Sequence, residues 1–123
     1  MIEKWRHPVT YFKSAHGLVL LREQILGPDR FDPAFRRFIA AWAYRHPQPA
    51  DFFRAMESEA GEDLSYWWNG WYAHNWQLDL AVTGIETAKD GTALVRVTSR
   101  DRLVMPATLR VTYAHGTTRA VSS

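Results

Sequence analysis

The spacing of apolar residues changes once along this chain, and that change limits the folds that the sequence can adopt. Up to about residue 76, apolar side chains recur at the helical spacing of i, i+3, i+4 and i+7. From Gln77 onward they alternate with polar ones, as Leu78, Leu80 and Val82 do, which is the period of a β-strand. A block of helices followed by a block of strands is typical of an α+β protein. The sequence therefore predicts a helical part over residues 1–76 and an antiparallel β part over residues 77–123.

The first expected helix follows an irregular lead-in over residues 1–10 and is the most apolar of the chain. Thr10 can cap it, since Pro8 excludes helix before Val9, and Gly27-Pro28 ends it after Leu26. Its apolar side chains form one wide arc, made of Tyr11, Phe12, Ala15, Leu18, Val19, Ile25 and Leu26. Because the arc is so wide, we expect this helix to be buried, with other helices on more than one side.

Two amphipathic helices are expected next. One starts at Asp32-Pro33, with the aspartate as N-cap and the proline in the first helical position, and ends before His46-Pro47. The other runs over about residues 49–60 and is stopped by Gly61. Charges on these helices, such as Glu57 and Glu59, are most simply solvated, and so is Lys13 on the first helix.

A short and almost wholly aromatic helix over residues 64–72 completes a compact bundle of about four helices. Asp63 can cap it. Its aromatic residues are Tyr66, Trp67, Trp68, Trp71 and Tyr72. Such a run can stack sugars or bases, but it more often forms the seam between a helical domain and its neighbour. We interpret it as a seam.

The β part is predicted to be a small antiparallel sheet, a partial sandwich. Residues 89–92 suit a hairpin turn, Arg100-Asp101-Arg102 suits a second turn, and His115-Gly116 begins a third. Three strands and the start of a fourth leave one face with nothing opposite it, whereas a sandwich needs two sheets. A piece of a larger protein explains this ending best, and we expect the piece to self-associate through the uncovered face and edge.

Composition argues against several kinds of partner. The net charge is only +2, and Arg36-Arg37 is the single basic doublet, so no nucleic-acid surface is expected. The chain has no cysteine, which excludes disulfides and thiolate zinc sites. It also lacks a run of about 18 apolar residues, so no membrane span is expected.

The histidines do not indicate a metal site. Five are present, and none lies in a His-Glu-x-x-His spacing or in another spacing that places ligands on one face. His16 shares the first helix with Tyr11 but points elsewhere. We find no Gly-x-Ser-x-Gly motif or glycine-rich phosphate loop either. By its own residues, the chain carries no complete catalytic constellation.

Tyr11 is the candidate catalytic residue. It lies in the first turn of the most apolar helix, where a phenol can project from the end of a rigid element and donate a hydrogen bond to a developing oxyanion. A core tyrosine whose hydroxyl is bonded locally explains the same position, and the residues alone favour that simpler explanation.

The order of several motifs resembles a known family. They are Tyr-Phe-Lys-Ser-Ala at 11–15, Leu-Gly-Pro-Asp-Arg-Phe-Asp-Pro-Ala-Phe-Arg-Arg at 26–37, Pro-Ala-Asp-Phe-Phe-Arg-Ala-Met-Glu at 49–57, Gly-Glu-Asp-Leu-Ser at 61–65, and Trp71. Together they resemble the segment downstream of the zinc site in gluzincin aminopeptidases of the aminopeptidase N and leukotriene hydrolase kind. Residues 104–111 resemble the start of the β-sandwich that follows that catalytic domain.

The resemblance implies a role for Tyr11 and a partner for the whole chain. In the family, the tyrosine of this motif stabilises the tetrahedral intermediate of peptide hydrolysis. Phe12, Ser14 and Asn75-Trp76 depart from the commoner residues, which points to a subfamily and leaves the peptide specificity open. The zinc ligands and the general base belong to an upstream half, which would be the partner of this chain, with a peptide as substrate.

Two hypotheses follow from the sequence. The first is a piece of a zinc-dependent aminopeptidase that forms one wall of the substrate cleft, with zinc in the complete enzyme but no metal site and no activity in this piece. The sequence leaves open whether the complete enzyme is periplasmic, secreted or membrane-anchored. The second is an independent α+β interaction module that docks a partner through its aromatic helix.

Overall fold

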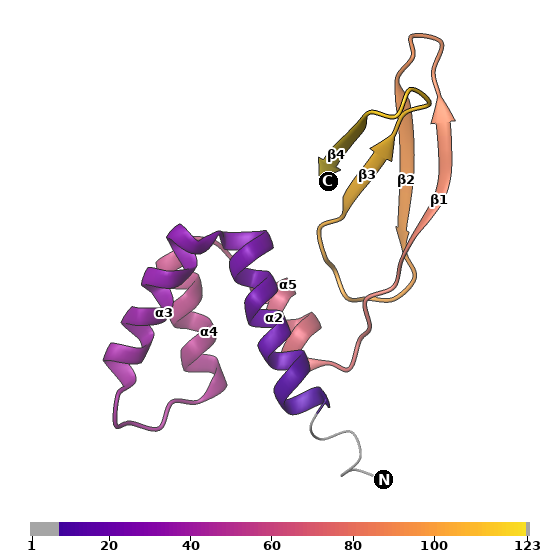
Figure 1. The fold of residues 1–123 in the computed structure, drawn as a ribbon. Helices are drawn as coiled ribbons and strands as arrows, with labels where there is room; N and C mark the ends of the chain where they lie inside the picture. The colour runs from indigo at the N-terminus through magenta and orange to yellow at the C-terminus, as the bar shows by residue number, and fades with distance from the viewer. Residues whose placement is uncertain (1–7, 123) are drawn as a thin grey trace. The chain divides into compact units, whose positions relative to one another are not determined.

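The computed structural model describes residues 8–122 and has an α+β fold, as the sequence predicts. Four helices precede two small antiparallel sheets of two strands each (Figure 1). The chain divides into two compact units, Met1–Asn75 and Trp76–Ser123, which are described in turn. Among the described helices, none combines the length and the apolar character that crossing a bilayer requires.

The first helix is continuous but changes its hydrogen-bonding register twice. A π-helical segment, η1 (Pro8–Lys13), leads into α2 (Ser14–Leu20), and a second π-helical segment, η2 (Leu21–Leu26), completes it. The helix ends at Gly27, whose φ of 77° lies in the region that glycine adopts easily. It already includes Pro8, which corrects the expected start near Thr10, because proline fits the first positions of a helix, where no amide donor is needed. Residues 1–7 of the expected lead-in lie outside the described part of the chain.

The expected burial of this helix on several sides is wrong. Its buried residues are Gly17, Leu21 and Leu26, which face α3 and the segment η3 (Asn69–Ala73). Phe12 and Val19 remain 71% and 53% exposed. The apolar arc is therefore covered by its own unit on one side only.

The second helix, α3 (Pro28–Trp42), begins at Pro28 and not at Asp32-Pro33. Gly27 directs the chain into the helix and Pro28 takes the first position, so Pro33 lies inside it. Asp32 does not act as N-cap, because its carboxylate accepts two hydrogen bonds from Arg22, at 2.6 Å from Nε and 2.9 Å from Nη2. An ion pair between two helices has replaced the expected cap.

The third helix, α4 (Pro49–Ala60), has the expected bounds and packs beside α3 (Figure 1). Gln48 and Asp51 form a reciprocal capping box at its start, in which the backbone N–H of Gln48 donates to Asp51 Oδ2 at 2.8 Å. Gly61, with φ of 70°, ends it in the left-handed conformation. Both ends therefore follow from local sequence signals.

The aromatic helix, α5 (Ser65–Trp68) continued by η3, contributes three tryptophans, Trp67, Trp68 and Trp71, to the core of the helical unit. The fully buried large side chains are Leu21, Met56, Leu64 and Trp67. Trp67 stacks on Trp71 at 5.2 Å between ring centroids, and Trp68 stacks on Phe53 at 4.5 Å. The aromatic run thus packs into the helical unit itself.

The second unit consists of two hairpins and not of one continuous sheet. Strands β1 (Leu80–Thr87) and β2 (Ala93–Ser99) form one pair, and β3 (Thr108–Thr112) and β4 (Thr118–Ser122) form the other. The fourth strand pairs along its whole described length with β3. The turn predicted at residues 89–92 is confirmed by bonds between Ala88 and Thr92.

A β-bulge keeps the apolar residues of the first hairpin on one face. Val82 pairs with Val97, whereas Gly84 already pairs with Arg96, so Thr83 is the extra residue. The Thr83 hydroxyl lies 2.9 Å from the Thr98 hydroxyl on the other face. The shift returns Ile85, which pairs with Val95, to the face of Val82 and Val97.

Candidate functional site

Tyr11 lies in the π-helical segment η1 and its side chain is 64% exposed. In this unit the ring therefore lies at the surface and not in a core, while the role of its hydroxyl stays a prediction. The ring is accessible from outside its unit, at the beginning of a packed helix.

Two hydrogen bonds tie the residues just after Tyr11 to the end of the aromatic helix. The Tyr72 hydroxyl donates to the carbonyl oxygen of Ser14 at 2.9 Å, and Lys13 Nζ donates to the carbonyl oxygen of His74 at 3.1 Å. Both bonds join segments that are distant in sequence. Lys13, expected to be a solvated charge, is thus an anchor of the first helix.

Gly17 allows the Tyr72 hydroxyl to come close to the backbone of the first helix. A Cβ atom at this position would lie 3.0 Å from the Tyr72 hydroxyl oxygen and 3.1 Å from Trp71 Cε3. Burial raises the pKa of the Tyr72 phenol well above its usual value, so the group stays protonated and remains a donor. The region around Tyr11 is therefore held by packing as well as by hydrogen bonds.

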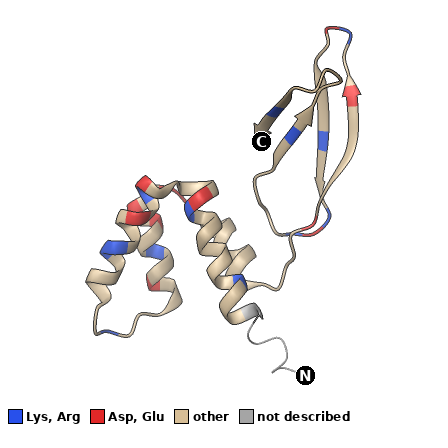
Figure 2. Ribbon diagram, in the orientation of Figure 1, with Lys and Arg blue, Asp and Glu red and all other residues tan. Residues whose placement is uncertain are grey.

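Charged side chains of the helical unit are paired between elements. Arg30 donates to Glu62 at 2.7 Å and to the carbonyl oxygen of Leu26 at 3.0 Å, and Arg37 pairs with Glu59. The bond from Arg22 holds the pKa of Asp32 below its usual range. Figure 2 shows acidic and basic residues intermixed on these helices.

Glu57 also differs from the expected solvated charge. Its Oε1 atom accepts hydrogen bonds from Trp68 Nε1 at 3.0 Å and from the Leu64 amide at 3.2 Å. Glu57 thus accepts a hydrogen bond both from the buried Trp68 indole and from the backbone amide at the start of the aromatic helix. Its role is structural.

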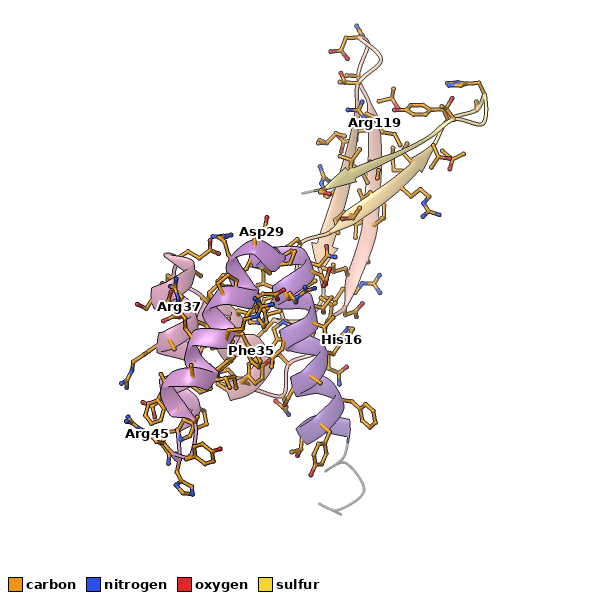
Figure 3. All side chains as sticks on the ribbon, turned by 60° about the vertical axis from the view of Figure 1, so that its left-hand side comes forward. His16, Asp29, Phe35, Arg37, Arg45 and Arg119 are labelled. Atoms are coloured by element: carbon orange, nitrogen blue, oxygen red, sulfur yellow. The ribbon has the colours of Figure 1, made fainter. Side chains whose placement is uncertain are left out.

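The histidines of the described chain do not assemble into a site. His16 lies on the first helix (Figure 3), exposed, with its ring 6.1 Å from that of Trp71. His46, His74 and His115 are exposed as well, and His7 lies outside the described residues. Within residues 8–122, no group of three His, Cys, Asp or Glu side chains is arranged to hold a metal ion.

Sequence reasoning named Tyr11 as a candidate, which stays a prediction, and missed Tyr72 and Lys13 as the groups that hold its helix. One signal was available, because a glycine inside a strongly apolar helix costs about 1 kcal/mol relative to alanine and often marks a close approach. Gly17 is such a residue. The partner in that approach could not be inferred from spacing along the chain.

No protein-family model matches the chain, and neither a curated protein nor a solved structure is significantly similar to it. The resemblance of its motifs to the gluzincin aminopeptidases therefore remains a prediction.

Proposed function

We propose that this chain is the C-terminal helical part of the catalytic domain of a zinc-dependent aminopeptidase, with the first strands of the β module that follows. In this proposal Tyr11 donates the hydrogen bond that stabilises the oxyanion during hydrolysis of the first peptide bond of a substrate. The helices form one wall of the substrate cleft. The proposal rests on motif order, and one observation on the first helix supports it best.

That observation is an uncovered apolar stripe beside Tyr11. Phe12, Ala15 and Val19 follow one another at helical spacing, and all three are exposed. Burying a side chain such as Phe or Val contributes about 1.5–3 kcal/mol. A helix with this stripe is expected to pack against a further part of a protein, as the upstream half of an aminopeptidase domain would provide.

The chain would contribute binding and electrostatic stabilisation to the reaction. Zinc, held by upstream residues, supplies the Lewis acid and the activated water in enzymes of this class. The described residues offer no ligand set for it. The Tyr11 hydroxyl would donate to the carbonyl oxygen of the scissile bond as that oxygen gains negative charge, an interaction stronger in the transition state than in the substrate.

The second hypothesis, an interaction module that docks through the aromatic helix, has less support. Trp67, Trp68 and Trp71 are all buried in the helical unit, so their rings are not offered to a partner. Of the aromatic residues on α5, Tyr66 is the one left exposed. A reading frame that continues upstream into a His-Glu-x-x-His sequence would favour the enzyme, and its absence would favour the module.

The decisive experiment uses the full-length protein that contains this chain. We expect Tyr11→Phe to lower kcat for an aminoacyl-p-nitroanilide by about 100-fold or more, as the loss of an oxyanion donor does, while zinc content stays unchanged. Tyr66→Phe, a matched change on an exposed ring, should leave kcat at the wild-type value. A wild-type protein that binds no zinc and hydrolyses no substrate would refute the proposal.

A further inference from the structure

The contacts that hold the beginning of the first helix converge on one short segment, η3. Tyr72 donates to the Ser14 carbonyl, His74 accepts from Lys13 just beyond the segment, and Trp71 lies against Gly17. Residues of α2 and η3 lie side by side in the fold. The helix that carries Tyr11 is therefore anchored three residues after Tyr11, from a segment far along the chain.

Ser14 is the residue at which the register of the helix changes. The π-helical hydrogen bonding of η1 ends at Lys13, and the α-helical bonding of α2 begins at Ser14. Each residue of an α-helix turns about 100° around the axis. A change of register before Ser14 would therefore alter the direction in which the Tyr11 side chain leaves the helix.

The Tyr72 side chain is well placed to fix that register. Its ring packs against Phe53 and Trp68, at 5.7 and 5.8 Å between centroids, so its hydroxyl is presented from a fixed position. Gly17 lets the hydroxyl approach the helix backbone. A tyrosine phenol is protonated near neutral pH, and burial raises the pKa of Tyr72 further. The Tyr72 hydroxyl therefore remains a hydrogen-bond donor near neutral pH.

We infer that Tyr72 is a positioning residue, which binds the Ser14 carbonyl, fixes the change from π- to α-helical register, and so sets the direction of the Tyr11 hydroxyl. This inference rests on the function proposed for Tyr11 and deepens it. Lys13, through the carbonyl of His74, is the second anchor of the same turn. Tyr72 does not itself touch the reacting atoms.

The first test uses the 123-residue chain and needs no catalysis. Tyr72→Phe keeps the ring packing and removes only the hydroxyl. We expect amide hydrogen exchange over residues 11–18 to accelerate about 2- to 10-fold, the range for loss of one intramolecular hydrogen bond. Exchange in α4 should not change. Tyr66→Phe, whose ring is exposed on the same helix, is the control and should leave residues 11–18 unaffected.

The second test is a double-mutant cycle in the full-length protein. We expect Tyr72→Phe to lower kcat about 3- to 10-fold, with KM and zinc content unchanged, when Tyr11 is present. In a Tyr11→Phe background, Tyr72→Phe should have no further effect on kcat. A residue that only stabilises the fold would lower kcat in both backgrounds.

The two tests separate the ways in which the inference can fail. Unchanged exchange in Tyr72→Phe would overturn it, whatever the enzyme does. Faster exchange with an equal loss of kcat in both backgrounds would also overturn it and would leave the proposed function intact. If the wild-type protein lacks zinc and activity, the proposed function fails and the role of Tyr72 in aiming Tyr11 fails with it.

Discussion

Gly17 is a residue at which close packing opposes a substitution that helix propensity favours. Alanine is favoured over glycine inside a helix by about 1 kcal/mol. A Cβ here would nevertheless lie 3.0 Å from the Tyr72 hydroxyl and 3.1 Å from Trp71. Trp71 is held in a stack with Trp67, and Tyr72 is held by its bond to Ser14, so neither neighbour can yield easily.

We therefore expect Gly17→Ala to lower the free energy of unfolding by about 1–2 kcal/mol, because overpacking outweighs the gain in helix propensity. Urea denaturation followed by circular dichroism measures the change. Ala15→Gly, at an exposed position of the same helix, reports the propensity alone and should cost up to about 1 kcal/mol. An increase in stability for Gly17→Ala would show that the approach of Tyr72 and Trp71 is looser than described.

Asp32 makes stability depend on pH in the acidic range. The hydrogen bonds from Arg22 lower its pKa in the folded state, and bonds from Ser65 and Thr92 do the same for Asp63 and Asp90. The unfolded chain binds protons at these carboxylates more readily than the folded chain does. The free energy that the carboxylates contribute to folding is therefore present above their unfolded pKa of about 4, and it is lost as the pH falls through their lower pKa values in the folded state.

We expect the urea midpoint to fall between about pH 6 and about pH 3, and to fall less in Asp32→Asn than in the wild type. Glu23→Gln is the matched control, since Glu23 also pairs with Arg22 but lies exposed next to it in the same helix. An equal fall in Asp32→Asn and wild type would mean that the pair with Arg22 contributes nothing at acidic pH.

At the scale of elements, the apolar stripe of the first helix tests whether an upstream half covers it, as the proposed function requires. We expect Phe12→Ser and Val19→Ser to change the stability of the 123-residue chain by no more than about 0.5 kcal/mol each, as exposed positions do. In the full-length protein each should cost about 1.5–3 kcal/mol, because an upstream half would cover the stripe. Thermal unfolding of both forms measures the difference. Gln24→Ser, on the polar side, should be neutral in both, and equal effects of Phe12→Ser in the two forms would contradict the proposed covering.

The ends of helices and the turns could be predicted from the sequence where the local residues alone determine them. Gly27 and Gly61 end helices in conformations that suit glycine, and the turn at residues 89–92 needs only its own residues. The predicted start of α3 was wrong because the Asp32 carboxylate can either cap a helix or pair with Arg22. Only the tertiary structure selects between these two interactions. The same applies to Tyr72, whose partner lies 58 residues away. The candidate Tyr11 was found from its motif, whereas the groups that hold it depend on packing.

At the scale of the whole molecule, the β unit is unusual because little of its apolar surface is covered. Among its described residues, Leu103 is the one that is buried. Val82 and Ile85 are 54% and 68% exposed, and the bulge at Thr83 places them on one face with Val95 and Val97. A contiguous apolar face of this kind, next to unpaired strand edges, favours association with another chain.

We therefore expect the 123-residue chain to self-associate as its concentration rises, and Ile85→Lys to shift it toward the monomer in sedimentation velocity, because a charge on the apolar face opposes its burial. Leu94→Lys is the matched control. Leu94 is equally an exposed apolar residue of the hairpin, but it pairs with Glu86 on the opposite face, so its substitution should leave association unchanged. If both variants dissociate the chain equally, general repulsion and not this face controls association. If the wild type stays monomeric at all concentrations, the hairpin face is tolerated in water and does not need the remainder of a sandwich to cover it.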